Sequence, residues 1–209
     1  MKYLIQISKN PFITEFFTKI FCEDLHEIFQ SGESYTFVGS NGSGKSTLLQ
    51  VLSGYMPLSE GIINYEINDN NIEIDNFYKH LIIAAPYLEL IEDFTLTELL
   101  AFHIKFKPLK NNLSIADFID YIELPKAKNK EIKFFSSGMK QRVKLGLAFL
   151  SDCEILMLDE PTSNLDAQAT NWYLRNVQEY SQNRLLFICS NQQSEYEFCK
   201  NILNIQDYK

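Results

Sequence analysis

A glycine-rich run at residues 39–47 has the residue types and spacing that suit phosphate binding. It reads G-S-N-G-S-G-K-S-T and matches the pattern G-x-x-x-x-G-K-[ST]. In such a loop, glycines let backbone N–H groups face the α- and β-phosphates, the lysine adds charge at the β- and γ-phosphates, and the next hydroxyl can hold Mg²⁺. The residues are Gly39, Ser40, Asn41, Gly42, Ser43, Gly44, Lys45, Ser46 and Thr47. They predict a nucleoside triphosphate site.

An acidic pair supplies the groups that a phosphate loop needs for hydrolysis. The apolar run at 154–158 reads as a strand and ends in Asp159 and Glu160. At the carboxyl end of a parallel strand, Asp159 is placed to contact Mg²⁺ directly or through water, and Glu160 can take the proton of an attacking water. An acidic strand end alone is common on protein surfaces, so this interpretation depends on the loop upstream.

The elements that would position these groups alternate between strands and helices. Period-two or apolar runs predict strands at Lys2–Ser8, within Phe12–Phe29, and at Tyr35–Val38, Gly61–Ile67, Leu81–Ala85, 154–158 and Leu185–Ser190. Helices are expected at Ser46–Leu52, from Thr95 towards Phe106, from Ser114 towards Ile122, and at Ser137–Leu150 and Ala167–Ser181. The pattern predicts an α/β fold: a P-loop NTPase core with a mostly parallel sheet, an N-terminal antiparallel β subdomain, and an inserted helical lobe at roughly 88–135. We expect a single domain over 1–209.

Bulk properties narrow the functional classes. With 209 residues, a net charge of −8 and 22% charged residues, the chain resembles a globular protein and not a partner of nucleic acid. Cys22, Cys153, Cys189 and Cys199 form no C-x-x-C pair, which indicates buried thiols in a reducing compartment. No apolar run approaches the ~18 residues of a membrane span. We expect a cytoplasmic protein.

Two further motifs identify a family. Residues 135–142 read F-S-S-G-M-K-Q-R before a predicted helix, and residues 163–166 read S-N-L-D after the acidic pair. The order of phosphate loop, L-S-G-G-Q-like signature, apolar strand with D-E, and S-x-L-D resembles the nucleotide-binding domain of ATP-binding cassette (ABC) ATPases over roughly residues 2–206. Alone, the serine and glycine run would read as a plain helix N-cap.

The resemblance implies ATP and Mg²⁺ as cofactors and a second copy of the chain as partner. Two copies would pair head to tail, so that one signature closes over the γ-phosphate held by the other copy's loop. The signature residues carried over are Ser136, Ser137, Gly138 and Met139, and Asp166 would communicate across the dimer interface. The family also stacks an aromatic ring on adenine, for which Phe16 is the candidate and Phe12 and Phe17 are competitors.

The chain departs from the family pattern at three places. The signature reads Phe-Ser-Ser-Gly-Met at residues 135–139, which we expect to be tolerated. Tyr87 stands where the family has a glutamine that touches Mg²⁺ and the attacking water, and a phenol with a pKa near ~10 is a poor ligand. Asn191 stands where the family has a histidine at the γ-phosphate, and an amide can donate a hydrogen bond but carries no proton at neutral pH. We therefore expect an active but slow or partner-dependent ATPase.

The function implied by the resemblance is the ATP-binding and ATP-hydrolysing subunit of an ABC transporter. It would drive a separate membrane permease, in the export direction, from the inner face of the cell membrane, with the helical lobe docking on the permease. One alternative is a soluble ABC-family ATPase that acts on a protein assembly. Another is a nucleotide-sensing module with impaired hydrolysis, against which the intact Glu160 argues.

Overall fold

A parallel sheet forms the centre of the computed structural model, which describes residues 3–8, 27–58 and 61–208. Its five strands lie in the order β6-β7-β8-β3-β9. They are β3 (Ser34–Val38), β6 (Leu81–Ala84), β7 (Ile155–Asp159), β8 (Leu185–Cys189) and β9 (Asn201–Asn204). Because all run parallel, their carboxyl ends share one edge, where open α/β sheets bind ligands.

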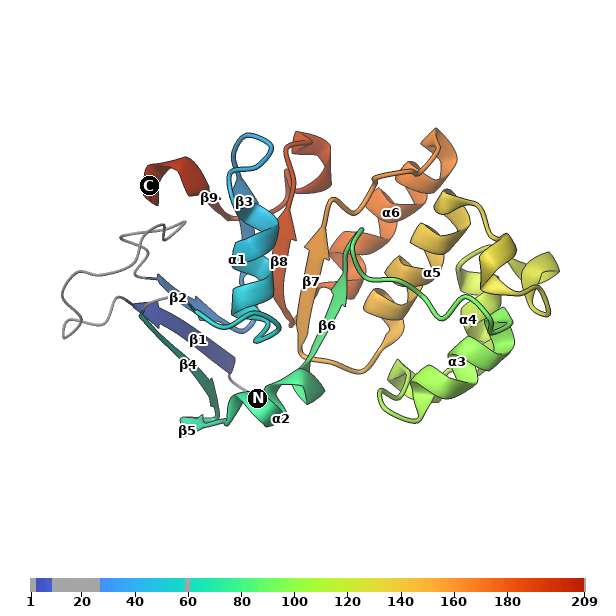
Figure 1. The fold of residues 1–209 in the computed structure, drawn as a ribbon, viewed down its shortest axis with the longest axis horizontal. Helices are drawn as coiled ribbons and strands as arrows, with labels where there is room; N and C mark the ends of the chain where they lie inside the picture. Colours follow the sequence, from blue (N-terminus) through green and yellow to red (C-terminus); the bar gives the residue numbers. More distant parts are fainter. Residues whose placement is uncertain (1–2, 9–26, 59–60, 209) are drawn as a thin grey trace.

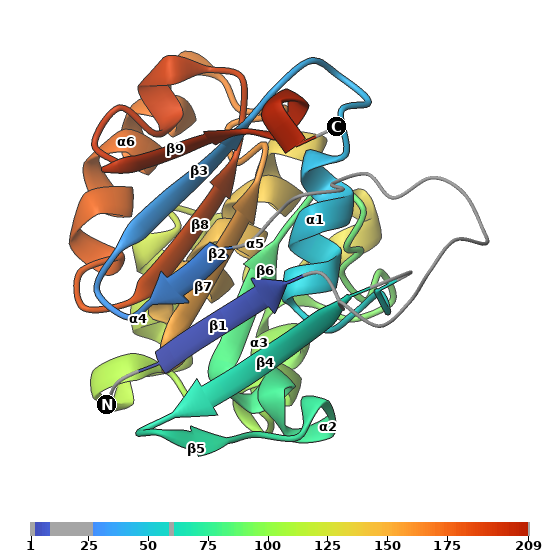
Figure 2. The ribbon, with the colours of Figure 1, turned by 90° about the vertical axis from the view of Figure 1, so that its left-hand side faces the viewer.

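A second, antiparallel sheet packs beside the first across a helix. Its order is β2-β1-β4-β5, from β1 (Tyr3–Ser8), β2 (Glu27–Gln30), β4 (Ile62–Ile67) and β5 (Asn70–Asn71). Helix α1 (Lys45–Leu52) lies between the two sheets (Figures 1 and 2). In register, Ile5 of β1 pairs with Phe29 and Tyr65, and all three are buried in a core shared with Leu49 of α1.

Alternate side chains of the central strands enter different cores, as the period of a strand requires. Ile155 and Met157 of β7 face α1 and the antiparallel sheet, whereas Leu156 and Leu158 face the helices on the other side. Strand β8 behaves in the same way. Strands buried on both faces read as continuous apolar runs, which is why these two are visible in the sequence.

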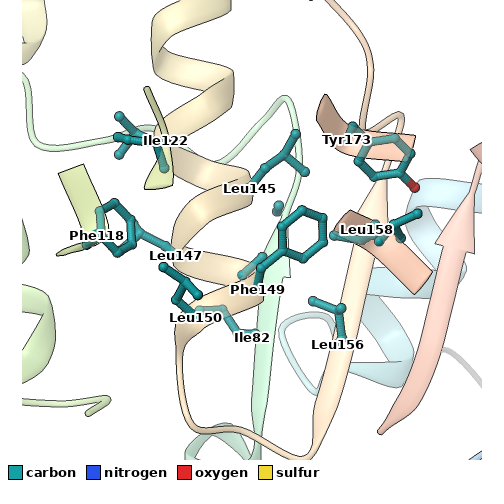
Figure 3. Packing of buried hydrophobic residues seen from close by; sticks show 14 of the residues in the cluster. Ile82, Phe118, Ile122, Leu145, Leu147, Phe149, Leu150, Leu156, Leu158 and Tyr173 are labelled. Carbon is teal, nitrogen blue, oxygen red and sulfur yellow. The ribbon is translucent and has the colours of Figure 1, made fainter. Parts of the chain in front are cut away.

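The remaining long helices form the other side of the molecule. They are α3 (Leu96–Ile104), α4 (Ile115–Tyr121), α5 (Ser137–Leu150) and α6 (Ala167–Tyr180), and their core includes Phe118, Phe149 and Tyr173 (Figure 3). Helices α5 and α6 lie against the parallel sheet, and α3 and α4 lie beyond α5 (Figure 1). Helix α2 (Ile74–Phe77) precedes β6. Short 3₁₀ turns lie at Tyr78–His80, Lys110–Asn112, Pro125–Ala127, Ile132–Phe134, Gln193–Glu195 and Ile205–Tyr208.

The predicted fold class is confirmed. Both expected capping boxes form, because the side chains of Thr95 and Ser114 accept from the backbone N–H three residues on, while Glu98 and Asp117 reach back. The sequence analysis did not predict β5, β9 or α2. Helices α3 and α4 lie on the far side of the molecule from the antiparallel sheet (Figure 1), but the lobe limits 88–135 and the single domain 1–209 stay predictions.

Two further expectations concern membrane spans and cysteines. Within the described ranges, no helix has both the length and the apolar character needed to cross a bilayer. Cys153, Cys189 and Cys199 are free and buried, as expected of structural thiols. Cys22 lies outside the described residues, and so do Phe12, Phe16 and Phe17, the candidates for stacking on adenine.

Candidate active site

The phosphate loop connects β3 to α1 with a backbone that only glycine adopts easily. Gly39 has φ +147° and Gly44, the N-cap of α1, has φ +100°. A Cβ on Gly39 would lie 2.8 Å from the Ser43 Oγ, closer than such atoms approach. The first turn of α1 has no side-chain cap and no acidic residue. Its N–H groups and partial positive charge are therefore directed at the space inside the loop.

Lys45 bends back over this loop. Its Nζ donates to the carbonyl oxygens of Gly39 at 2.8 Å and of Ser40 at 3.3 Å, and the residue is only 6% exposed. The ammonium thus lies in the concavity where the β- and γ-phosphates of a bound nucleotide would sit. Phosphate oxygens are stronger acceptors for an ammonium than neutral carbonyls are, because both groups are charged.

Asp159 ends β7 at the same edge of the sheet. It is 1% exposed, and its Oδ1 has no hydrogen-bond partner among the described residues. Burial raises the pKa of Asp159, while a hydrogen bond with Ser46 and the charge of Lys45 act in the opposite direction. A buried carboxylate oxygen without a partner is costly and indicates a missing ligand. Asp159 and the Ser46 hydroxyl supply the oxygen donors that Mg²⁺ prefers, so these residues fit the ion.

Glu160 follows with its side chain exposed. Its φ of +43° lies in the left-handed region that non-glycine residues rarely adopt. Two backbone hydrogen bonds fix this turn: the Glu160 N–H donates to the Cys189 oxygen at 2.9 Å, and the Ser163 N–H donates to the Glu160 oxygen at 3.0 Å. Asp159 is buried and Glu160 is exposed, so the two carboxylates occupy different environments and can take different roles.

Asn191 reaches the phosphate loop from the end of β8. Its Oδ1 accepts from the Gly39 N–H at 3.4 Å, and its Nδ2 donates to the Asn41 Oδ1 at 3.2 Å. Neither described histidine is near. His80 pairs with Glu154 at 3.3 Å, and His103 contacts the Ser151 hydroxyl at 2.8 Å, both beyond the opposite ends of the strands.

Tyr87 lies in the turn that follows β6, which pairs with β7 through Ala84 and Leu158. Burial raises the pKa of Tyr87, the charge of Asp159 raises it further, and a hydrogen bond with Gln50 lowers it. The phenol therefore stays protonated at neutral pH, which suits a hydrogen-bond donor better than a metal ligand.

The signature residues begin α5. Ser136 is the N-cap, and its Oγ accepts from the Met139 N–H at 3.2 Å; Ser136 and Ser137 are exposed. A Cβ on Gly138 would meet the Asn164 oxygen at 3.0 Å, so the signature touches the 163–166 segment. In the described part of the chain, no hydrogen bond joins this segment to the chain's own phosphate loop.

Asp166 is exposed and acts as the N-cap of α6, where its carboxylate accepts from the Ala169 N–H at 2.8 Å. It lies on the signature's side of the chain, close in sequence to Asn164. Nothing in the described residues assigns it a contact with the phosphate loop of the same chain. A role across an interface stays a prediction.

Sequence reasoning missed a buried acid that holds the segment after Glu160. Glu195 is 1% exposed, and its Oε1 accepts from the Thr162 N–H at 3.0 Å and from the Thr162 hydroxyl. The Tyr173 hydroxyl donates to the Glu195 backbone oxygen at 3.1 Å. The polar run at 191–195 gave no periodic signal that one of its members is buried.

Comparisons with known proteins agree with this geometry. Residues 22–163 match the family model described as "ABC transporter". The chain is 30% identical over 182 residues to the linearmycin resistance ATP-binding protein LnrL of Bacillus subtilis, covering 85% of this chain and 58% of that protein. It is 28% identical to the sulfate/thiosulfate import ATP-binding protein CysA 2 of Rhizobium meliloti, covering 87% of this chain and 52% of that protein. The chain thus spans just over half the length of these relatives.

Solved structures show the same fold. A dimeric ATP-binding cassette in a post-hydrolysis state, bound to ADP and phosphate, superposes with a TM-score of 0.77 at 18% identity. The match covers 98% of this chain and 94% of that one.

Proposed function

The chain belongs to the ABC transporter family, and from this premise we propose that it binds and hydrolyses ATP to drive a separate membrane permease. One observation carries the proposal: Asp159 at the end of β7 and Asn191 after β8 both lie at the phosphate loop, where Lys45 begins α1. Glu160 follows Asp159 at the open edge of the sheet. Lys45 supplies a positive charge for the phosphates, Asp159 a ligand for Mg²⁺, and Glu160 a base for the attacking water.

Each group has a distinct role. Lys45 and the N–H groups at the start of α1 bind and orient the triphosphate, and they stabilise the charge that develops on its oxygens. Ser46 and Asp159 would hold Mg²⁺, which when bound supplies positive charge to the β- and γ-phosphate oxygens. Glu160 would accept the proton of the attacking water, because its carboxylate is exposed directly after Asp159 at the end of β7. With nucleotide bound, the Asn191 amide N–H, which donates to Asn41 in this structure, would donate to the γ-phosphate, and the protonated phenol of Tyr87 would act as a further hydrogen-bond donor.

The partner of each site is a second copy of the chain. The exposed serines that begin α5 have no hydrogen bond to their own loop in the described residues, so we propose that they close over the γ-phosphate of the partner. Ser136, Ser137, Gly138 and Met139 form this surface. The dimeric cassette among the structural neighbours supports the geometry in general.

Export is the proposed direction, and the permease would place the chain at the inner face of the cell membrane. A relative named for linearmycin resistance supports export, whereas a relative named for sulfate/thiosulfate import supports the opposite direction. Transport into inside-out vesicles that contain the chain and its permease decides between them, because an exporter fills such vesicles when ATP is supplied outside. ATP-dependent emptying of preloaded inside-out vesicles would contradict export.

The hydrolysis proposal is tested by Glu160→Gln. We expect turnover of ATP with Mg²⁺ to fall by about 10²-fold or more, since a general base contributes on that scale, with ATP affinity within about twofold of the unchanged protein. Glu179→Gln, an exposed acid on α6, is the matched control and should change neither quantity. Equal turnover by Glu160→Gln, measured with the permease present, would sink the proposal. Native protein that fractionates without membranes and hydrolyses ATP would favour the soluble assembly ATPase.

A further inference from the structure

A lysine of α5 binds the turn that carries Tyr87. The Lys144 Nζ donates to the backbone oxygen of Ala85 at 3.0 Å and to that of Pro86 at 3.3 Å. Both acceptors belong to the turn Ala85–Leu88, which closes when the Leu88 N–H donates to the Ala85 oxygen at 3.3 Å. Tyr87 is the third residue of this turn. Its direction therefore depends on where the lysine holds the two preceding carbonyl groups.

Partial burial and neighbouring charges around Lys144 affect the strength of this contact. Ala85 is fully buried, and burial lowers the pKa of Lys144, while Glu89 attracts its charge and Lys140 repels it. A hydrogen bond from an ammonium to a carbonyl is charge-assisted and stronger than a neutral one, and partial burial strengthens it further. Methionine keeps an unbranched side chain of similar length, so Lys144→Met removes the ammonium and its two hydrogen bonds with little other change.

The turn that carries Tyr87 lies at the edge of the sheet where β7 ends in Asp159. Strands β6 and β7 are neighbours, with Ala84 opposite Leu158, so the residues after both strands meet at one edge of the sheet. The phenol experiences the charge of Asp159 and a hydrogen bond with Gln50. Gln50 lies one helical turn after Ser46 on the same face of α1.

The same helix holds other parts of the site. Gln141 of α5 is buried, and its Nε2 donates to the Pro161 oxygen at 2.8 Å, just after Glu160. The helix begins at the signature, and Ser136 and Lys144 lie about 12 Å apart along its axis. Helix α5 thus contacts the segment after Glu160 through Gln141 and the turn of Tyr87 through Lys144. At its start it carries the serines that we propose bind a partner's nucleotide.

We propose that Lys144 is a positioning residue for ATP hydrolysis. It holds the turn Ala85–Leu88 so that Tyr87 faces Asp159, and it makes the position of Tyr87 follow the movement of the signature helix. The proposal rests on the hydrolysis proposed above. When Ser136 at the start of α5 binds the nucleotide held by the partner, the resulting movement of α5 would be passed by Lys144 to the turn of Tyr87. The chain's own site would thus respond to closure of the dimer.

Kinetics of Lys144→Met test the functional part. We expect kcat for ATP with Mg²⁺ to fall about tenfold while KM stays within about twofold, because a misplaced Tyr87 affects the reaction more than nucleotide binding. Lys144→Arg keeps the charge and should retain at least half of kcat. Lys79→Met removes an exposed lysine that binds Asn76 on the same segment and is the matched control. Unchanged kcat in Lys144→Met overturns the proposal.

Combining the change with Tyr87→Phe separates positioning from general damage. If Lys144 acts through the phenol, the double variant Lys144→Met/Tyr87→Phe has a kcat within about twofold of Tyr87→Phe alone, since the two changes share one pathway. A further tenfold loss in the double variant would show that Lys144 acts elsewhere and would overturn the proposal.

Amide hydrogen exchange tests the contact without catalysis. Peptides covering residues 85–90 should exchange at least about fivefold faster in Lys144→Met than in Lys79→Met, because the turn loses its anchor. Equal exchange overturns the proposal whether or not the protein hydrolyses ATP. If the unchanged chain with its permease binds ATP but shows no turnover, the proposed function fails, and the exchange result still decides whether Lys144 holds the turn.

Discussion

At the phosphate loop, the side-chain amide of Asn191 makes two hydrogen bonds, one as acceptor and one as donor. It accepts from the Gly39 N–H and donates to Asn41, so the amide bridges both sides of the loop entrance. An imidazole with one N–H can donate to one partner and, when protonated, add positive charge near a phosphate. The neutral amide cannot add that positive charge, so we expect weaker stabilisation of charge on the γ-phosphate.

Substitution Asn191→His should raise the rate of hydrolysis. We expect kcat to increase about tenfold or more, because a transition-state donor is typically worth about 10²–10³ and the amide already supplies part of it. Steady-state ATPase assays at saturating ATP check this. Asn191→Ala serves as the comparison and should lower kcat. A rate for Asn191→His at or below that of Asn191→Ala would contradict the assignment of this position.

At the scale of elements, α5 packs so closely on α4 that one glycine has no space for a side chain. A Cβ on Gly146 would lie 2.4 Å from the Ile122 Cγ2 and 2.9 Å from the Phe118 Cζ (Figure 3 shows both neighbours). In an open helix, alanine would be favoured over glycine by about 1 kcal/mol. Here the clash involves fully buried side chains, so its cost should exceed the gain in helix propensity.

We expect Gly146→Ala to lower the free energy of unfolding by about 1–3 kcal/mol, the usual cost of overpacking a core. Urea unfolding followed by circular dichroism measures it. Gln178→Ala, an exposed helix-interior change on α6, should stay within about 0.5 kcal/mol. A stabilised Gly146→Ala protein would mean that α4 and α5 can separate at no cost.

The contact between α3 and the end of α5 should depend on pH. Burial, and to a lesser degree the charge of Lys107, lowers the pKa of His103 to about 4, and its ring meets the Ser151 hydroxyl at 2.8 Å. Because the folded pKa lies below the unfolded value near ~6.5, the unfolded chain takes up the proton first as pH falls. The stabilisation that neutral His103 provides is fully present above about pH 6.5, and it is lost as the pH falls from about 6.5 to about 4.

His103→Gln removes this titration while keeping a neutral group opposite Ser151. Between pH 8 and pH 5, the original protein should lose about 2 kcal/mol more of its free energy of unfolding than the variant does. Urea titrations at both pH values give the difference. Parallel pH dependence of the two proteins would show that the His103 pKa is not lowered by folding.

The elements that could be predicted from the sequence are those whose apolar pattern or capping residues directly reflect their structure. Strands β7 and β8 are buried on both faces, so they appear in the sequence as apolar runs. Helices α3 and α4 each begin with a capping box, which the sequence also shows. Among the described strands, β9 lies at the edge of its sheet and pairs with β3 alone, and its sequence N-I-L-N buries Leu203 alone. A strand with so little apolar alternation carries no recognisable signal.

The site divides in a similar way. Lys45 and Asp159 were predictable because a local motif contains each of them. The contacts of Glu195 with Thr162 and of Lys144 with Ala85 join segments far apart in the chain, and nothing near either residue in the sequence specifies a partner. Only the sheet order brings these segments together.

At the scale of the whole molecule, α3 presents an aromatic surface away from the nucleotide. Phe102 and Phe106 are 41% and 69% exposed, Phe94 contacts Phe102 edge-on at 5.8 Å, and Ile91 lies 40% exposed on the segment before α3. We expect this surface to dock on the permease, since solvated aromatic rings of this size usually mark an interaction site.

Phe106→Ser should therefore separate the chain from its permease without affecting its fold. We expect copurification with the membrane partner to fall at least about tenfold, because a central aromatic anchor is typically worth 2 kcal/mol or more. Basal ATPase activity and the thermal midpoint should not change. Tyr78→Ser, an exposed aromatic outside this surface, is the control. Undiminished copurification would place the docking surface elsewhere.

Two complementary defects test whether each site is shared between two chains. Lys45→Met damages the phosphate loop, and Ser137→Arg blocks the exposed start of α5, so each variant alone should hydrolyse little ATP. In a head-to-tail dimer of both variants, one site combines an intact loop with an intact signature, and the other has both defects. An equal mixture should recover about a quarter of the original activity if pairing is random and the sites are independent. A mixture as inactive as its components would mean that loop and signature do not meet across a twofold axis, and the dimeric mechanism would have to be abandoned.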